Sequence, residues 1–175
     1  RNPGLGRAEL EAAFAAQLGA REVVWLDGAD GGRLDITDMH IDGFARFAPG
    51  PVLVTLSDAD LARWGVPPAD VARLAALTDA SGAPYPRVNL PLTAADVVTP
   101  GGEDLRFPGS YLNFYVANGL VLVPTYADVQ DAAALAAVGA LFPDRAVRGI
   151  DSRQLFQWGG MIHFVTQQEP AGRRR

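Results

Sequence analysis

Two side chains with complementary chemistry lie close together in the first half of this 175-residue sequence. His40 and Asp42 are two positions apart, and Asp38 adds a further carboxylate just before them. On a β-strand, side chains two apart project from the same face, so His40 and Asp42 would point together. A carboxylate accepts paired N–H bonds from a planar cation, and an imidazole transfers protons near neutral pH. This arrangement suits cleavage of a guanidinium group.

A second stretch of interest lies near the end of the sequence. Gly159 and Gly160 have no Cβ, so the backbone there can approach a ligand closely. We interpret His163 as a member of a buried polar network at the end of a strand. Phe164 follows it, and its side chain has no lone pair and no acid–base chemistry. Phe164 therefore cannot act as a nucleophile.

A third stretch, residues 110–119, combines aromatic and turn residues. We interpret Tyr111 and Phe114 as core residues, and we expect Asn113 to face a central cavity. Asp128 and Asp131 precede an Ala-rich segment and are better explained as turn and helix-capping residues than as catalysts.

Two simpler interpretations of the His40 region remain open. The segment could be an acidic loop leading into a strand, with His40 bonded only to backbone. It could also bind a metal ion, because carboxylates and imidazole are common metal ligands. No second cluster of such ligands occurs elsewhere in the sequence, so we predict neither a metal nor a cofactor. The four residues of this metal alternative are Asp35, Asp38, His40 and Asp42.

Taken together and in this order, the three stretches resemble agmatine deiminases and bacterial peptidylarginine deiminases, in the C-terminal half of those enzymes. The family attacks a guanidinium carbon with a Cys in the context Gly-Gly-Gly-x-His-Cys-x-Thr-Gln-Gln, aided by a His-x-Asp pair. Here Phe164 stands at the position of that Cys, and the sequence contains no Cys at all. An Arg-Asp-x-Gly-Pro motif, which carries a further guanidinium-binding carboxylate in the family, is also absent.

The resemblance implies the hydrolysis of agmatine to N-carbamoylputrescine and ammonia, a step of putrescine biosynthesis. Because the covalent nucleophile is missing, we expect this chain to be inactive as given. The alternatives are a degenerate, non-catalytic fragment or binding domain, and a family substrate other than agmatine, namely peptidyl-arginine or free arginine. The implied catalytic positions are His40, Asp42 and Phe164, and the implied substrate-binding positions are Asp38, Asn113, Gly159 and Gly160.

The composition limits the kinds of molecule that this chain is expected to bind. A net charge of −5 argues against nucleic acid and anionic membranes, and the terminal run at 173–175 is too short to change that. No run approaches the roughly 20 apolar residues of a membrane helix. We therefore expect a cytoplasmic protein that takes a small guanidino ligand such as agmatine. Self-association through an exposed module edge is a further expectation.

Hydrophobic periodicity and turn residues predict a repeated plan of strand, strand, helix and strand. Placing residue 40 over residue 110 gives an offset of 110 − 40 = 70, so the chain would hold about 2.5 such modules. The resemblance implies an α/β fold of pseudo-repeated ββαβ modules, about half of a five-module propeller of the pentein type. We assign 1–170 to this domain and 171–175 to a disordered tail. The expected elements are a helix at 9–18, strands at 22–26, 40–47 and 51–56, a helix at 68–77, strands at 85–92, 111–117 and 120–124, a helix at 131–142 and a strand at 146–150.

Overall fold

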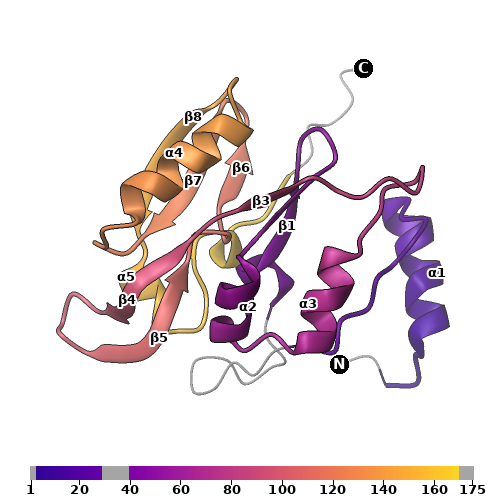
Figure 1. Cartoon of the computed structure of the whole chain (residues 1–175), viewed down its shortest axis with the longest axis horizontal. Coiled ribbons are helices and arrows are strands. Elements are labelled where there is room, and N and C mark those ends of the chain that lie inside the picture. Colours follow the sequence, from indigo (N-terminus) through magenta and orange to yellow (C-terminus); the bar gives the residue numbers. More distant parts are fainter. Residues whose placement is uncertain (1–2, 29–39, 170–175) are drawn as a thin grey trace.

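The computed structural model describes residues 3–28 and 40–169. Their fold is mixed α/β, with short sheets and helices that alternate along the chain (Figure 1). The elements are α1 (Arg7–Leu18), η1 (Ile41–Gly43), β1 (Ala45–Ala48), β2 (Val52–Thr55), α2 (Asp58–Trp64), α3 (Pro68–Ala75), β3 (Arg87–Asn89), β4 (Leu92–Val98), β5 (Asp104–Ser110), β6 (Tyr115–Ala117), β7 (Leu120–Thr125), α4 (Asp131–Leu141), β8 (Ala146–Asp151), α5 (Arg153–Phe156) and η2 (His163–Val165).

Two units share one topology. In the first, β1 and β2 form an antiparallel hairpin, and β3 returns parallel to β2 after α2 and α3. In the second, β6 and β7 form the hairpin, and β8 returns parallel to β7 after α4, which covers this sheet (Figure 1). Strands β4 and β5 pair only with each other among the described residues. The two predicted strand-strand-helix-strand units are therefore confirmed, and they form separate sheets instead of one doubly wound sheet.

The hairpins turn where the sequence provides residues suited to positive φ. Gly119 has φ +68° between β6 and β7, and Gly50 has φ +75° between β1 and β2. Such φ values suit a residue without Cβ. The Asn118-Gly119 signal therefore located its hairpin correctly.

The strand predicted at 40–47 is wrong in its first half, which contains His40 and Asp42. Residues 40–43 form a 3₁₀ turn, with the amide of Gly43 donating to His40 O at 3.0 Å and that of Phe44 to Ile41 O at 3.0 Å. Gly43 is buried against the indole of Trp64, and a Cβ added there would lie 3.4 Å from the ring. The chain turns tightly beneath this indole, and β1 begins only at Ala45.

Other predicted boundaries also need correction. The strand expected from Tyr111 begins at Tyr115, because Tyr111 to Phe114 form a buried, irregular connection. The candidate strand 22–26 is not a strand and has no strand partner among the described residues. Helix α2 was not predicted, although Ser57 caps it by accepting from Asp60 N at 3.1 Å.

Aromatic side chains join the sheets into one core. The Tyr126 ring packs edge-on against Tyr111 and Phe156, at centroid distances of 5.5 and 5.6 Å. Its hydroxyl donates to Ser110 O at 2.8 Å. Burial raises the pKa of Tyr126 well above its usual value, so this phenol stays neutral. Gly109 leaves the space that the ring fills.

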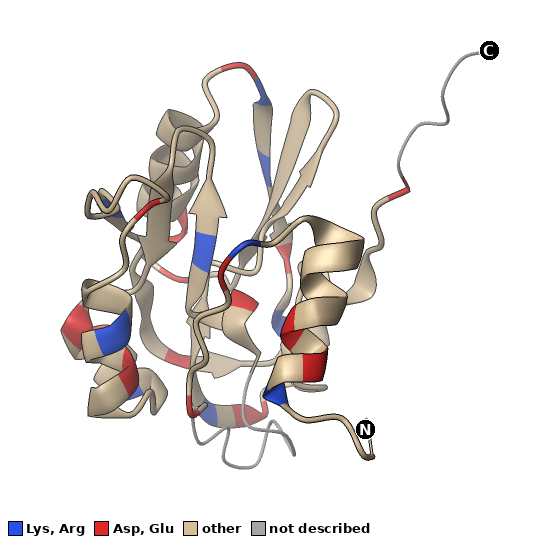
Figure 2. Ribbon diagram, turned by 90° about the vertical axis from the view of Figure 1, so that its right-hand side faces the viewer, with Lys and Arg blue, Asp and Glu red and all other residues tan. Residues whose placement is uncertain are grey.

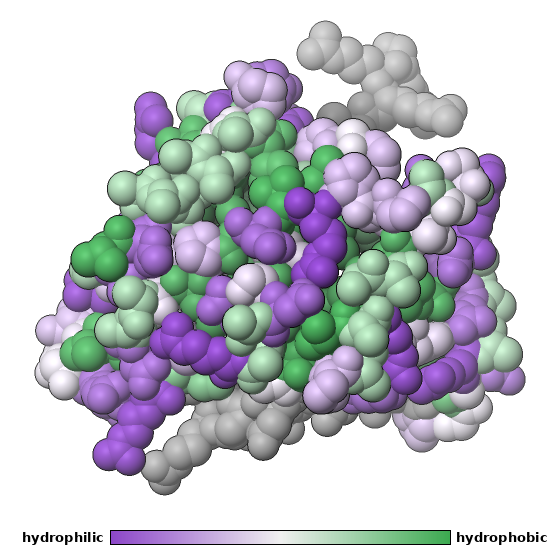
Figure 3. All heavy atoms as spheres, in the orientation of Figure 1, coloured by the Kyte–Doolittle hydropathy of each residue, from purple (hydrophilic) through white to green (hydrophobic). Residues whose placement is uncertain are grey.

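Charged residues of both signs are interspersed over helices and loops in Figure 2. Hydrophobic and hydrophilic side chains are likewise intermingled on the face shown in Figure 3. Across residues 3–28 and 40–169, no helix combines the length and the apolar character needed to cross a bilayer.

A buried carboxylate anchors the chain just before the candidate site. Asp70 of α3 is fully buried and accepts hydrogen bonds from the amides of Asp27 and Gly28 at 2.8 to 3.0 Å. Arg73 approaches the same carboxylate at 2.5 Å. The negative charge thus has three donors in place of water, as a buried carboxylate requires.

We expect Asp70→Asn to lower the free energy of unfolding by about 2 kcal/mol, because an amide replaces one acceptor oxygen by a donor that faces other donors. Urea denaturation measures this change. The control is Asp58→Asn, which removes an exposed ion pair with Arg87 and should cost less than about 0.5 kcal/mol. Equal losses in the two variants would contradict a special role for Asp70.

Gly109→Ala tests the close contact with Tyr126. A Cβ at this position would lie 2.7 to 2.8 Å from atoms of the buried ring, which has no free space to enter. We expect a loss of about 1 to 3 kcal/mol. Gly101→Ala is the matched control, since its nearest neighbour would be 3.7 Å away. A Gly109→Ala variant as stable as the control would show that the ring moves freely.

Candidate active site

The candidate site is organised around the carboxylate of Asp42. Asp42 Oδ2 accepts a hydrogen bond from Asn113 Nδ2 at 2.7 Å and lies 2.5 Å from His163 Nδ1. Asn113 also binds the His163 backbone, because the His163 amide donates to Asn113 Oδ1 at 3.0 Å. The three residues form a closed cluster, which we call the Asp42 cluster. It fixes the orientation of all three side chains.

A partly buried cation, Arg46, lies beside this cluster. The guanidinium of Arg46 donates to the carbonyl oxygens of Leu112 and Phe114, on either side of Asn113. Its Cζ lies 4.3 Å from the centroid of the Phe114 ring. Burial lowers the pKa of Arg46 from its usual value, and the charge of Asp42 acts in the opposite direction. Asp42 therefore has a positive neighbour without a direct ion pair.

His40 and Phe164 meet at the surface next to this cluster. Their ring centroids are 6.0 Å apart and the ring planes are at 80°. Phe164 is 57% exposed, and His40 is exposed as well. Because His163 and Phe164 are adjacent in the chain, His40, Asp42 and Phe164 are brought to one region although 124 positions separate residues 40 and 164.

The two glycines of this region have different roles. Gly159 has φ +80°, which favours glycine, and its amide donates to Phe156 O at 3.0 Å. Gly160 is buried, and a Cβ there would lie 2.4 Å from Phe164 Cδ1. Gly160 therefore allows the Phe164 ring to lie against the backbone.

His40, Asp42 and Phe164 lie in one region of the structure as expected, but the elements that position them differ from the predicted strand. His40 and Asp42 do not lie on a strand, and the described partners of Asp42 are Asn113 and His163. His163 belongs to a polar network as predicted, but it begins a 3₁₀ turn and its side chain is 31% exposed. Asp38 lies outside the described residues. No sequence signal pointed to the pairing of Asp42 with His163, which are 121 positions apart.

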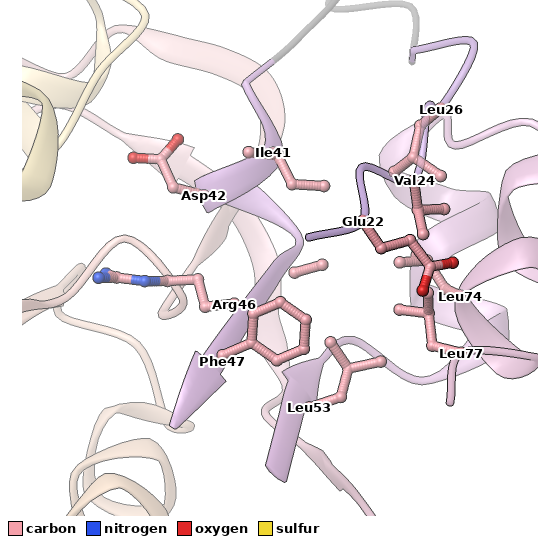
Figure 4. A pocket seen from close by; sticks show the side chains of 11 residues that line it. Glu22, Val24, Leu26, Ile41, Asp42, Arg46, Phe47, Leu53, Leu74 and Leu77 are labelled. Atoms are coloured by element: carbon pink, nitrogen blue, oxygen red, sulfur yellow. The ribbon is translucent and has the colours of Figure 1, made fainter. Parts of the chain in front are cut away.

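A cavity of about 480 Å³ lies on the other side of β1. Asp42 and Arg46 contribute to its lining, but Figure 4 shows their charged ends directed away from its centre, whereas Phe47 and Leu53 face the side chains across it. The lining is predominantly apolar, with Glu22 near one end. The polar cluster and the mainly apolar cavity thus adjoin each other at Asp42 and Arg46, which line the cavity with their parts nearer the backbone. Among the described residues, no group of three or more His, Asp or Glu side chains could hold a metal ion.

The sequence matches a known family over nearly its whole length. A family model described as Porphyromonas-type peptidyl-arginine deiminase matches residues 1–170. The chain therefore belongs to this family, and the resemblance seen in its motifs is confirmed.

Individual relatives carry more specific names. The chain is 35% identical to an agmatine deiminase of Pseudomonas fluorescens Pf-5, over 99% of this chain and 51% of the relative. It is 34% identical to that of Pseudomonas putida F1, over 100% and 51%. The solved agmatine deiminase of Enterococcus faecalis matches with a TM-score of 0.78 at 30% identity, over 97% of this chain and 50% of that one. The chain thus spans about half the length of these relatives.

Asn113→Ala tests the Asp42 cluster. The substitution removes the hydrogen bonds to Asp42 and to the His163 amide at a position that is 3% exposed. We expect a loss of about 1 to 3 kcal/mol in unfolding free energy and a changed NMR environment of the His163 ring. The exposed Asn89 provides the control, since Asn89→Ala should leave the His163 resonance in place. An unchanged His163 spectrum in Asn113→Ala would contradict the cluster.

Proposed function

We propose that this chain is part of a guanidino-group hydrolase of the agmatine deiminase type, which converts agmatine and water to N-carbamoylputrescine and ammonia. The observation that carries the proposal is the Asp42 cluster beside His40, in a chain that belongs to the deiminase family. The names of its relatives support agmatine as the substrate. Peptidyl-arginine is the alternative, supported by the description of the family model.

Asp42 is proposed to hold the guanidinium of the substrate. Asn113 and His163 both contact Oδ2, which leaves Oδ1 as the oxygen without a described hydrogen bond. A carboxylate fixed in this way presents an acceptor without paying further side-chain entropy. Asn113 thus supports Asp42, and Asp38, Gly159 and Gly160 are proposed to complete the substrate contacts.

His40 is proposed to transfer protons. Its ring is exposed beside Phe164, so it can reach both a bound ligand and solvent water. Release of ammonia from a guanidinium requires a proton on the leaving nitrogen, and attack by water requires a base. A single imidazole can serve both steps in turn.

We further propose that the chain alone has no turnover. The family resemblance puts a Cys nucleophile at the position of Phe164, and none of these 175 residues is Cys. Phe164 also occupies space beside His40 where a reacting carbon would have to approach. A non-catalytic domain that binds guanidinium compounds weakly is the second candidate, and the same Phe164 observation favours it.

The arrangement of units is proposed to be part of a five-module fan with its axis near His40, Asp42 and His163. Two observed units of one topology support this. The site lies between segments contributed by both units, as expected for a site on such an axis.

Incubation of the chain with agmatine, followed by an ammonia assay, tests the activity. We expect no ammonia above background, and no rescue by Phe164→Cys alone, because the chain lacks the Arg-Asp-x-Gly-Pro carboxylate motif. The Pseudomonas fluorescens relative is the positive control. Ammonia production by the unmodified chain, abolished by His40→Ala, would show that a Cys-independent route exists.

Binding is tested separately by NMR titration with agmatine. We expect agmatine to change the chemical shifts of His163 and Asn113. Asp42→Asn should lower the affinity for agmatine, obtained from this titration, at least tenfold. The exposed control Asp58→Asn should leave the affinity unchanged. Shifts that are identical in Asp42→Asn would eliminate Asp42 as the guanidinium acceptor.

A further inference from the structure

The β6–β7 hairpin turns at two residues that can react with each other. Asn118 and Gly119 are both exposed. They form the whole connection between the two strands, since β6 ends at Ala117 and β7 begins at Leu120. Neither Asn118 nor Gly119 belongs to the Asp42 cluster, and the proposed function gives neither of them a role.

An Asn side chain that precedes a glycine can lose its amide to the backbone. The nitrogen of the glycine attacks Cγ of the Asn, so a new N–Cγ bond forms and the Cγ–Nδ2 bond breaks. The side-chain amide leaves as ammonia with the proton of the attacking N–H. Water then opens the cyclic imide at either carbonyl, which gives aspartate or isoaspartate. Glycine favours the attack because no Cβ hinders it.

The structure leaves this reaction accessible at the hairpin tip. A Cβ added to Gly119 would meet no atom within 4 Å, so the space beside its backbone is open. Within the part of the chain that the structure describes, the Gly119 amide donates no backbone hydrogen bond. Its carbonyl, by contrast, accepts from the Ala146 amide at 3.0 Å. Gly119 is therefore held at its carbonyl while its nitrogen stays available.

The two other described asparagines are protected by the fold. Asn89 is exposed, but the nitrogen that would attack it, that of Leu90, donates to Thr55 O at 2.9 Å. Asn113 is 3% exposed, and its side chain is held within the Asp42 cluster. Asn118 thus differs from both in having an exposed side chain and a following amide without a described backbone partner.

We propose that Asn118 is a site of spontaneous deamidation and that the modification loosens the hairpin tip. Isoaspartate adds a methylene group to the main chain, so a two-residue connection no longer keeps Ala117 opposite Leu120. The Gly119 carbonyl then moves away from Ala146, and β8 loses a hydrogen bond at its first residue. This inference does not depend on the proposed function.

The reaction at Asn118 releases the same small product as the proposed hydrolysis of agmatine. Its ammonia is limited to one molecule per chain and does not require agmatine. The rate rises with pH, because the attacking backbone nitrogen must lose its proton. Ammonia from a turnover reaction would instead continue beyond one equivalent and depend on the agmatine concentration.

Peptide mapping by mass spectrometry after incubation of the complete chain without agmatine tests the site. We expect conversion of Asn118 to aspartate and isoaspartate at least tenfold faster than conversion of Asn89, and faster still at alkaline pH. Asn118→Gln should abolish most of the ammonia released, because a Gln side chain would have to close a larger ring. The matched control Asn89→Gln should leave the release unchanged. An Asn118 that stays unmodified, or equal rates at Asn118 and Asn89, would overturn the proposal.

Hydrogen exchange tests the structural consequence. In the isoaspartate form, separated from the unmodified chain, the Ala146 amide should exchange at least tenfold faster, while the Leu90 amide in the other sheet should be unchanged. Asn118→Asp adds the charge without lengthening the main chain, so its Ala146 amide should exchange as in the unmodified chain. An Ala146 amide equally protected in the isoaspartate form would contradict the loosening of the hairpin tip.

Discussion

The carboxylate of Asp42 is the point at which three distant parts of the chain meet. Its contacts reach Asn113, 71 positions away, and His163, 121 positions away. A partly buried carboxylate needs donors to replace water, and here the donors come from the connection before β6 and from η2. The positions of both connections therefore depend on this single charge.

Arg46 has the complementary role. Its guanidinium satisfies the carbonyls on either side of Asn113, in an irregular connection that has no strand to pair with. A neutral side chain of similar length could not supply as many donors. The charge of Arg46 also lies near Asp42, so the two partly buried charges compensate each other while each keeps its own hydrogen-bond partners. Polar groups can be buried at this junction because every side chain of the Asp42 cluster has a described partner.

Local sequence signals predicted local structure well and tertiary contacts poorly. Helix α4, β8 and the hairpin at Gly119 were predicted nearly to the residue, because turn glycines and hydrophobic periodicity are local features. The strand predicted at 40–43 was wrong, because these residues form a 3₁₀ turn that packs against the indole of Trp64, a contact distant in sequence. Strand β5 was missed because it contains Pro108 and Gly109, both unfavourable in strands. The resemblance pointed to residues that the structure brings close together, but the hydrogen bonds among them followed from the structure alone.

The spacing of contacts along the chain has a kinetic consequence. The strands of the β6–β7 hairpin are joined by a two-residue turn, whereas the Asp42 cluster closes loops of 71 and 121 residues. Loop closure costs entropy before such contacts contribute, so pairings close in sequence form first during folding. The Asp42 cluster then forms after the sheets have docked. Weakening it accelerates unfolding more than it slows folding, so the lifetime of the assembled state depends most on the residues that form last.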